Sequence, residues 1–450
     1  MSDPLLLNDH GGGLVGDVAL QDVVTYDQVG RQRASPKRAH FLSSVANLSN
    51  AAVGAGILGL PFAFYKAGII WATLLMILVV GCTCISFYMM ARMSQQFQCR
   101  SYDDVSAAAF GVPGRVVGTV CLVVYYFCVL WAYVILIGNF LTLLFLPVCG
   151  ATCIATNRYF MVGLVMALVI LPLSTLKRMH HLRVTSYVAL VAILLAVVVI
   201  VVRFAVPYGA RPAGTPVLFQ FDVQVVLAFP IMLLAFAAQG NVVSIHYELG
   251  GPDRERSMAW VIITSVLICF CFYFTAGLMG YLLFPTGLTG DVFLSFDPND
   301  PLAIVARVGV LVSIVFSYPV VFYPAREVMF SVVFLAKRTA SSTPRPRWGW
   351  VGKSDLLARV ILTVSFGVVL YLLGVFLPQV GIVFEIAGAT FGVAFSLVLP
   401  AVCWIKTAPP GTKWHSPHCW LAYLIMTVGT VFGLVALGSS IYELAMGHPI

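Results

Sequence analysis

Residues 51–61 read Ala-Ala-Val-Gly-Ala-Gly-Ile-Leu-Gly-Leu-Pro, and they occupy the middle of the first long apolar segment. This stretch contains four residues that form helices poorly, namely Gly54, Gly56, Gly59 and Pro61. A membrane span that is interrupted at mid-depth frees backbone N–H and C=O groups, which are tolerated only where they line a cavity or hold a ligand. The stretch therefore predicts a solute-binding site about halfway across a membrane.

The composition of the chain is that of an all-α, polytopic membrane protein. Its 450 residues are 60% hydrophobic and 10% charged, whereas about a quarter of the residues in soluble domains are charged. An apolar helix of about 20 residues crosses the hydrocarbon core of a bilayer. We predict eleven such spans, at about 43–68, 70–94, 116–146, 159–176, 184–206, 223–248, 258–284, 301–330, 356–377, 379–405 and 419–445.

The Lys and Arg residues predict the orientation of the spans. If the N-terminus is cytosolic, twenty of the 26 fall on the cytosolic side, and Arg326 lies near the inner end of a span. The other five fall outside: Lys66, Arg158, Arg203, Arg211 and Arg307. This positive-inside pattern predicts a cytosolic N-terminus and an extracellular or lumenal C-terminus. The net charge of +8 then reflects anchoring near anionic lipid, and no nucleic-acid partner is expected.

A second interruption predicts an internal repeat. The sixth span weakens around residues 237–241, and spans one and six are matching members of two five-span halves. Interrupted helices at corresponding positions point to an inverted-repeat transporter. We predict repeats at about 43–206 and 223–405, followed by a peripheral helix at about 419–445. Residues 1–42 have few aromatic side chains and are predicted to form a disordered cytosolic tail, whereas residues 43–450 form the transmembrane domain.

Four blocks of the sequence resemble the sodium-coupled neutral amino acid transporters of the amino acid/auxin permease superfamily. The most specific block is the first-span sequence Asn47-Leu-Ser-Asn-Ala-Ala-Val-Gly-Ala-Gly-Ile-Leu-Gly-Leu-Pro61. The other three blocks lie at residues 236–249, 317–327 and 385–400, and the resemblance covers about residues 40–445. It implies a LeuT-like architecture of eleven transmembrane helices, with a five-plus-five inverted repeat and broken helices 1 and 6. It also implies amino acid symport driven by Na⁺ or H⁺.

The first interruption is the predicted binding site for the substrate carboxylate. Exposed N–H groups at the N-terminus of a half-helix attract an anion, and glycine lets the backbone approach closely. We predict main-chain contacts from Gly54, Ala55, Gly56 and Ile57. The alternative is that these small residues serve close helix packing.

Side chains near the second interruption and on span three are predicted to shape the pocket. The candidates are Phe236, Gln239, Asn241, Tyr126 and Tyr133. Tyr126 and Tyr133 are seven residues apart and so share one face of a helix. Packing within the helix bundle is the alternative for each aromatic residue.

The resemblance also implies a Na⁺ site. It places a metal-binding hydroxyl at Ser317 and a second ligand at Asn50, with main-chain oxygens near Ala52, Val53 and Ser313 completing the shell. Many family members carry Thr where this chain has Ser317, so the choice between Na⁺ and H⁺ stays open. The alternative for Ser317 is a hydroxyl bonded to a carbonyl in the preceding turn of its own helix.

Glu385 is an ionisable residue inside a predicted span, and such residues are functional hypotheses by default. A proton-coupling role is one interpretation of this residue. The other is that its side chain reaches water or fixes a helix end, since it lies only some six residues from the outer end of the span.

The sequence therefore predicts a secondary active transporter that moves neutral or small amino acids with Na⁺ or H⁺ by alternating access. The alternatives are a proton-coupled carrier of the lysosome or vacuole and an amino acid sensor. We expect no cofactor beyond the coupling ion, a monomer, and a location in the plasma membrane or a lysosomal or vacuolar membrane. An enzyme is not expected, because His180 and His181 lie in a predicted loop without a matching acid or cysteine.

Overall fold

The computed structural model describes residues 41–150, 152–175, 182–206, 214–249, 254–338, 353–377, 379–409 and 416–446. All of them belong to the compact unit formed by Ala39–Ile450. The predicted tail lies outside the described residues except for its last two positions, and so do His180 and His181.

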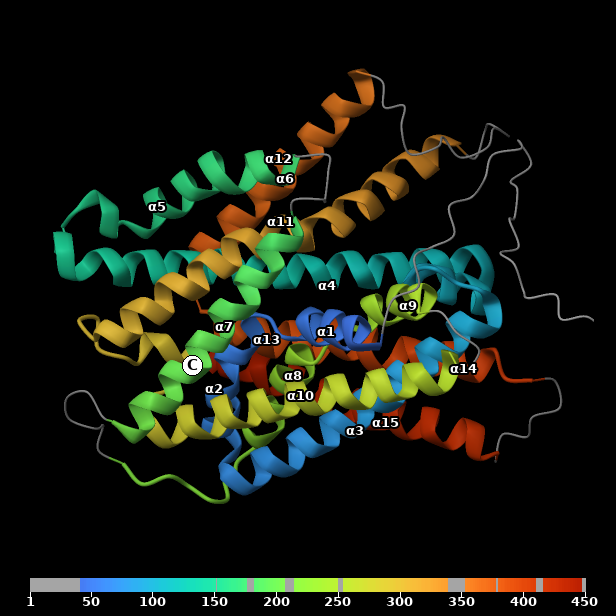
Figure 1. Cartoon of the computed structure of the whole chain (residues 1–450), viewed down its shortest axis with the longest axis horizontal. Helices are drawn as coiled ribbons and strands as arrows, with labels where there is room; N and C mark the ends of the chain where they lie inside the picture. Colours follow the sequence, from blue (N-terminus) through green and yellow to red (C-terminus); the bar gives the residue numbers. More distant parts are fainter. Residues whose placement is uncertain are drawn as a thin grey trace, which may run out of the picture. The chain divides into compact units, whose positions relative to one another are not determined.

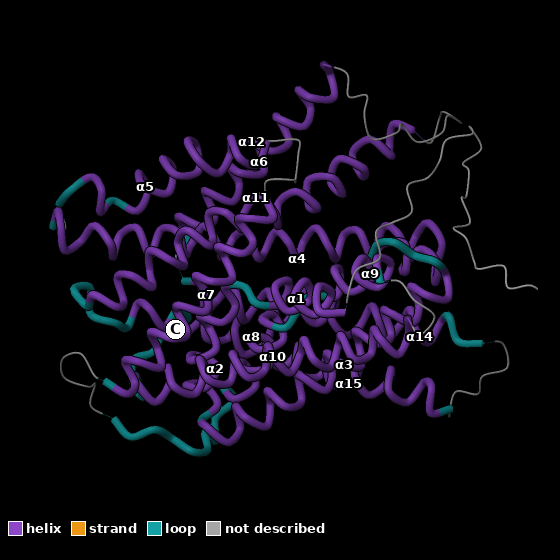
Figure 2. Tube along the Cα trace, viewed as in Figure 1, coloured by secondary structure: helices purple, strands orange, loops and turns teal. Residues whose placement is uncertain are grey.

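Helices account for almost all of the described chain (Figures 1 and 2). The α-helices are α1 (Phe41–Ala52), α2 (Leu60–Ala67), α3 (Ile69–Phe97), α4 (Tyr102–Cys149), α5 (Arg158–Val165), α6 (Leu171–Thr175), α7 (Leu182–Ala205), α8 (Val225–Ala235), α9 (Gln239–Glu248), α10 (Arg254–Leu283), α11 (Pro301–Arg338), α12 (Lys353–Phe376), α13 (Val380–Ala387), α14 (Leu399–Lys406) and α15 (Pro417–Met446). Short 3₁₀ turns are η1 (Ala55–Gly59), η2 (Ile154–Thr156) and η5 (Val292–Leu294), and π-helical stretches are η3 (Met166–Ile170), η6 (Gly388–Gly392) and η7 (Ala394–Val398).

The apolar helices coincide with the predicted spans. Among the described residues, nine helical segments are long and apolar enough to cross a membrane. The bent pair Phe41–Ala52 and Gly56–Ala67 forms a tenth segment, and a shorter apolar helix covers Val360–Phe376. The all-α membrane fold with two broken helices is therefore confirmed, whereas the count of eleven and the inverted repeat stay predictions.

The first span breaks where its sequence predicts. α1 ends at Ala52, and the two halves of the span are bent by 54°. Gly54 is extended, with φ −131° and ψ −163°, and the turn η1 follows it. Pro61 lies in the first turn of α2, where the missing N–H of proline removes no helical hydrogen bond. The glycines thus permit the break, and the proline fixes where the helix resumes.

The sixth span breaks slightly earlier than the predicted residues 237–241. Helix α8 ends at Ala235, residues 236–238 are not helical, and α9 begins at Gln239. Gln239 and Asn241 therefore lie in the first turn of the second half-helix rather than in the interruption itself.

Long continuous helices surround the two broken spans (Figure 1). Helix α10 packs against α1, η1 and α2, so one uninterrupted helix follows both halves of the first span. Helix α4 bends at Gly111, whose positive φ of 66° suits glycine, and then runs through the bundle. The tenth span contains the π-helical stretches η6 and η7, and such stretches are frequent at functional sites.

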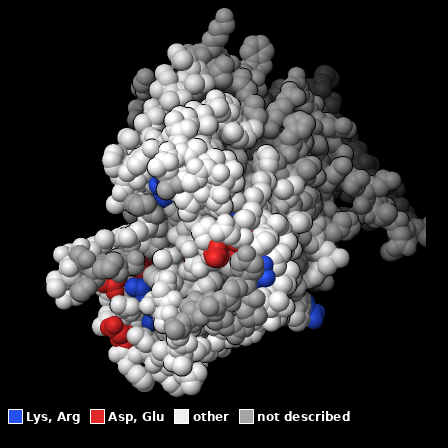
Figure 3. Space-filling model, turned by 90° about the vertical axis from the view of Figure 1, so that its left-hand side faces the viewer, with Lys and Arg blue, Asp and Glu red and all other residues white. Residues whose placement is uncertain are grey.

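The end of the bundle that carries the loops after α4 and α10 lies at the left of Figure 1 and faces the viewer in Figure 3. Most of the surface visible there is uncharged, with few Lys and Arg side chains among the described residues. The orientation of the chain across the membrane stays a prediction.

Candidate transport site

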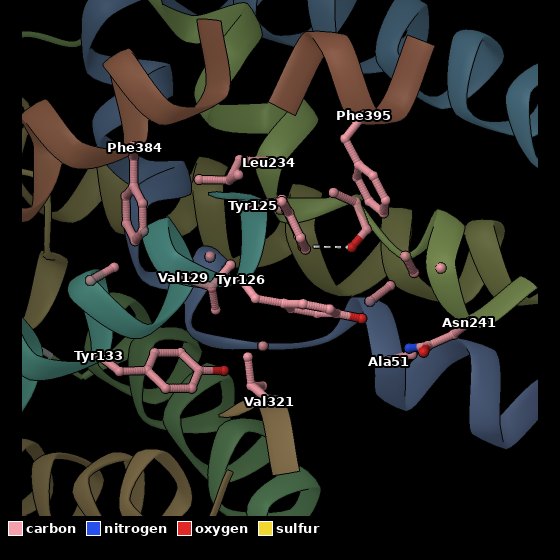
Figure 4. Close-up of a pocket in the computed structure, with 18 residues that line it drawn as sticks. Ala51, Tyr125, Tyr126, Val129, Tyr133, Leu234, Asn241, Val321, Phe384 and Phe395 are labelled. Atoms are coloured by element: carbon pink, nitrogen blue, oxygen red, sulfur yellow. Dashed lines mark hydrogen bonds between the residues drawn. The ribbon is translucent and has the colours of Figure 1, made fainter. Parts of the chain in front are cut away.

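A cavity of about 130 Å³ lies between the two breaks (Figure 4). None of the residues that line it is charged: they are Ala51, Ala52, Gly54, Gly56, Tyr125, Tyr126, Val129, Ala132, Tyr133, Leu234, Ala235, Ala237, Ala238, Gly240, Asn241, Val321, Phe384 and Phe395. We call this space the central cavity.

The first break turns backbone groups toward the central cavity. The first N–H groups of a helical turn have no partner within the turn. In η1, the N–H of Ile57 already donates to the carbonyl of Gly54 at 3.3 Å. Of the N–H groups that precede this bond, the one of Gly54 interacts with the hydroxyl of Tyr273, which leaves those of Ala55 and Gly56 as candidate donors for an anionic ligand.

The two breaks approach each other closely at Gly56. A methyl group on Gly56 would lie 3.0 Å from the Cα of Ala235, which is too close without a shift of the backbone. A methyl group on Gly54 would lie 3.7 Å from the hydroxyl of Tyr133, an ordinary contact. Gly56 is therefore needed for packing between the breaks, whereas the space beside Gly54 is open.

Three tyrosines of α4 line the central cavity. The hydroxyl of Tyr125 donates to the carbonyl of Ala237 at 2.9 Å, and Figure 4 shows this bond as a dashed line. The hydroxyls of Tyr126 and Tyr133 extend into the space between the breaks (Figure 4). Tyr125 thus holds the second break in place, while the other two hydroxyls face the cavity.

The structure does not bring Phe236 and Gln239 into the cavity wall. Phe236 is buried and packs edge-on against Tyr273, with ring centroids 4.8 Å apart. The side chain of Gln239 is also buried and exchanges two hydrogen bonds with Ser396. Gln239 is the first residue of α9, and neither side chain is among those that line the cavity. Asn241, by contrast, lines the cavity.

A second cavity of about 380 Å³ adjoins the first and shares Ala51, Gly54, Tyr126, Tyr133, Asn241 and Val321 with it. Four of the predicted cation ligands line this second cavity, namely Asn50, Val53, Ser313 and Ser317, whereas Ala52 lines the central cavity. The Ser313 hydroxyl donates to the carbonyl of Ala189 at 3.2 Å. Glu248 is the one charged residue among those that line the cavity.

Glu385 lies apart from both cavities. It is fully buried, and one carboxylate oxygen lies 3.8 Å from the Nζ of Lys66. The hydroxyl of Ser440 donates to its other oxygen at 3.3 Å, and Lys66 also pairs with Glu443 at 3.3 Å. A charged cluster therefore joins α2, α13 and α15.

Two residues of the tenth span also line the cavity, although the sequence analysis did not predict them. Phe384 and Phe395 line the cavity opposite the tyrosines of α4 (Figure 4). The ring of Phe395 stacks on that of Tyr125, with centroids 4.6 Å apart. Gly388 and Gly392, between these two residues, are a local sign that this span is unusual.

A loop between α10 and α11 covers the first break. Its turn η5 packs against η1 and is capped by Asp291, whose side chain accepts a bond from the N–H of Phe293 at 3.0 Å. Burial raises the pKa of Asp291 to about 7, although the Phe293 N–H and Arg307 favour the charged form. This carboxyl group therefore titrates near neutral pH while buried beside the site.

The sequence was compared with known families and proteins. The family described as "Transmembrane amino acid transporter protein" matches residues 37–446. Amino acid transporter AVT6E of Arabidopsis thaliana is 25% identical over 457 residues, covering 97% of this chain and 90% of the relative. Sodium-coupled neutral amino acid symporter 2 of Danio rerio is 26% identical over 400 residues, covering 83% of this chain and 76% of the relative.

A solved structure of a Na⁺-coupled sialic acid symporter, in a substrate-bound outward-open state, has a similar fold. Its TM-score is 0.51, and the match covers 90% of this chain and 91% of that chain. The sequence identity is 12%, so this similarity concerns the fold alone.

Proposed function

Since the chain belongs to the family of transmembrane amino acid transporters, we propose that it carries small neutral amino acids together with Na⁺. Family membership makes it a multi-pass membrane transporter and not an enzyme. The relative named as a sodium-coupled neutral amino acid symporter supports both the substrate class and the ion.

The observation that carries the proposed substrate class is the uncharged wall of the central cavity. A cationic or anionic side chain buried there would lack a counter-charge, which makes burial costly. The small volume, and apolar residues such as Leu234, Val321 and Phe384, favour a small apolar side chain.

The carboxylate of the substrate binds at the first break in this proposal. The N–H groups of Ala55 and Gly56 supply hydrogen bonds, and the dipole of the half-helix that follows adds a favourable field. Tyr126, Tyr133 and Asn241 supply polar side chains on the other walls. Phe236 and Gln239 do not contact the substrate. They hold the second break in place through their contacts with Tyr273 and Ser396.

The cation binds beside the carboxylate, in the second cavity where it adjoins the central cavity. Asn50 and Ser317 supply side-chain oxygens, and the main chain near Ala52, Val53 and Ser313 supplies carbonyl oxygens. The carboxylate of Glu248 lines the same cavity and favours the presence of a cation there.

The second cavity is the inner pathway in this proposal. It reaches Asn47 in α1 and Glu248 at the end of α9, which the positive-inside pattern assigns to the cytosolic side. The N-terminus is then cytosolic and the C-terminus extracellular or lumenal. The central cavity opens to the two sides of the membrane in turn, so substrate and ion enter together from one side and leave together on the other, by alternating access.

Uptake into proteoliposomes tests the function directly. We expect an inward Na⁺ gradient to accelerate the uptake of small neutral amino acids, and a pH gradient alone to have little effect. A pH-driven uptake that is lost in Glu385→Gln would support the proton-coupled alternative and contradict Na⁺ coupling. If neither gradient drives uptake while the protein binds amino acids, the sensor alternative gains support.

A further inference from the structure

Three polar residues spaced four apart on α10 donate hydrogen bonds to the backbone of α1. The hydroxyl of Ser265 donates to the carbonyl of Val45 at 3.2 Å. The thiol of Cys269 lies 3.9 Å from the carbonyl of Ser49. The hydroxyl of Tyr273 donates to the carbonyl of Ala52 at 2.6 Å. One face of α10 therefore follows α1 to its last residue.

Tyr273 differs from the other two because it contacts both breaks. Its hydroxyl also lies 2.9 Å from the carbonyl of Ala235. Ala52 and Ala235 are the last residues of α1 and α8, so both accepting carbonyls stand where a helix stops. The Tyr273 side chain is fully buried.

The chemistry of the helix ends explains why a donor is needed here. The last carbonyls of a helix have no partner within the helix and carry a partial negative charge. Two such oxygens close together repel each other, and a donor placed between them offsets the repulsion. The ring of Phe236 packs edge-on against Tyr273 and fixes the position of its hydroxyl.

We propose that Tyr273 is a positioning residue that sets the distance between the two breaks and thereby the fit of the central cavity to its substrate. Both Ala52 and Ala235 line this cavity, so a change in their separation alters its walls directly. The inference rests on the proposed function for its transport readout, although the geometry itself does not depend on transport.

The variant Tyr273→Phe tests this role because it removes the hydroxyl and keeps the ring. Loss of one buried hydrogen bond corresponds to about a fivefold to tenfold change in an equilibrium constant. We expect the KM for a neutral amino acid to rise by about tenfold, with the maximal rate within about twofold of the wild type. We also expect the substrate to raise the thermal midpoint of the purified variant less than that of the wild type.

Two controls separate positioning from a general structural role. Tyr318→Phe removes a buried hydroxyl that has no hydrogen-bond partner among the described residues, so its KM should equal that of the wild type. Ser265→Ala removes a bond from the same face of α10 far from the break, so it should lower the thermal midpoint without changing KM. A Tyr273→Phe variant that lowers the midpoint and leaves KM unchanged would overturn the proposal.

Hydrogen exchange of the purified proteins gives a readout that needs no transport. In Tyr273→Phe, the backbone amides of residues 53–56 and 236–239 should exchange at least about tenfold faster, whereas Tyr318→Phe should match the wild type. Unchanged exchange in Tyr273→Phe would overturn the positioning role. A wild type that takes up no amino acid contradicts the proposed function, and the exchange rates then still decide the role of Tyr273.

Discussion

The two breaks differ in geometry and in partners, since only the first is bent by more than 40°. At the first break, residues 53–56 include two glycines, and Gly54 and Gly56 line the central cavity. At the second break, residues 236–238 are Phe-Ala-Ala, and side chains from other spans hold its backbone. Tyr125 bonds to Ala237, and Tyr273 contacts Ala235 as well as Ala52 of the first break.

This difference shows that an interrupted helix is not in itself a binding site. A freed backbone group whose hydrogen bond is made by the protein supports the structure, whereas one that faces a cavity is available to a ligand. An unsatisfied buried polar group costs about 1–3 kcal/mol. A substrate that satisfies such groups therefore gains affinity at the first break, while the second break is already stable without it.

The largest expected effect comes from adding bulk where the breaks meet. Gly56→Leu should reduce substrate affinity by more than about 100-fold, because the new side chain collides with the backbone of Ala235. Gly81→Leu is the matched control, since a methyl group on Gly81 in α3 would meet nothing within 4 Å. Binding measured by substrate-induced thermal stabilisation compares the two. Normal binding by Gly56→Leu would contradict the assignment of the carboxylate to the first break.

The cation site beside the first break should depend on one hydroxyl. Ser317→Ala should raise the Na⁺ concentration for half-maximal uptake by about tenfold, because the cation loses one of its oxygen ligands. Ser313→Ala should change it less than about threefold, since Ser313 is proposed to act through its main chain and its hydroxyl already bonds to Ala189. Equal effects of the two variants would argue against Ser317 as the side-chain ligand. Uptake measured over a Na⁺ series distinguishes these outcomes.

Removing the hydrogen bond that Tyr125 donates to the second break should lower the stability of the protein without substrate. Tyr125→Phe leaves the carbonyl of Ala237 without this donor and should destabilise the protein by about 1–2 kcal/mol. We expect a lower thermal midpoint without substrate and a change in KM below about fivefold. Tyr126→Phe removes a hydroxyl that faces the cavity, and its loss should instead weaken binding. If Tyr125→Phe weakened binding and Tyr126→Phe lowered the thermal midpoint instead, the proposed difference between the two breaks would be wrong.

The smallest expected effect concerns the loop over the first break. The pKa of Asp291 is raised from 3.8 to about 7, chiefly by burial, so the folded state binds the proton more tightly than the unfolded state. The stabilising contribution of this proton is complete below about pH 4 and is lost as the pH rises through about 7. Asp291→Asn should therefore be more stable than the wild type at pH 8 and equally stable at pH 4.

Thermal midpoints measured over this pH range test the role of Asp291. Asp297→Asn, in the exposed part of the same loop, provides the control and should leave the pH dependence unchanged. An Asp291→Asn variant with the wild-type pH profile would show that another group is responsible.

The sequence alone determined the membrane class, the positions of the apolar helices and the places where two of them break. These features are local: an apolar run of sufficient length forms a span, and Gly54, Gly56 and Pro61 disfavour a continuous helix wherever they occur. Asn50 and Ser317 were implied by the resemblance to a known family, and the fold places both around one cavity although they are distant in the chain.

Only the tertiary structure decided which side chains meet. It turned Phe236 and Gln239 away from the cavity, and it joined Glu385 to Lys66 and Glu443. It also placed Tyr273 between the ends of two helices, although its partner Ala52 is 221 positions away. Hydropathy and helix propensity describe neighbours along the chain, whereas a hydrogen bond between distant spans depends on how the helices rotate and pack. For this reason the breaks could be predicted, but the residues that hold one and leave the other open could not.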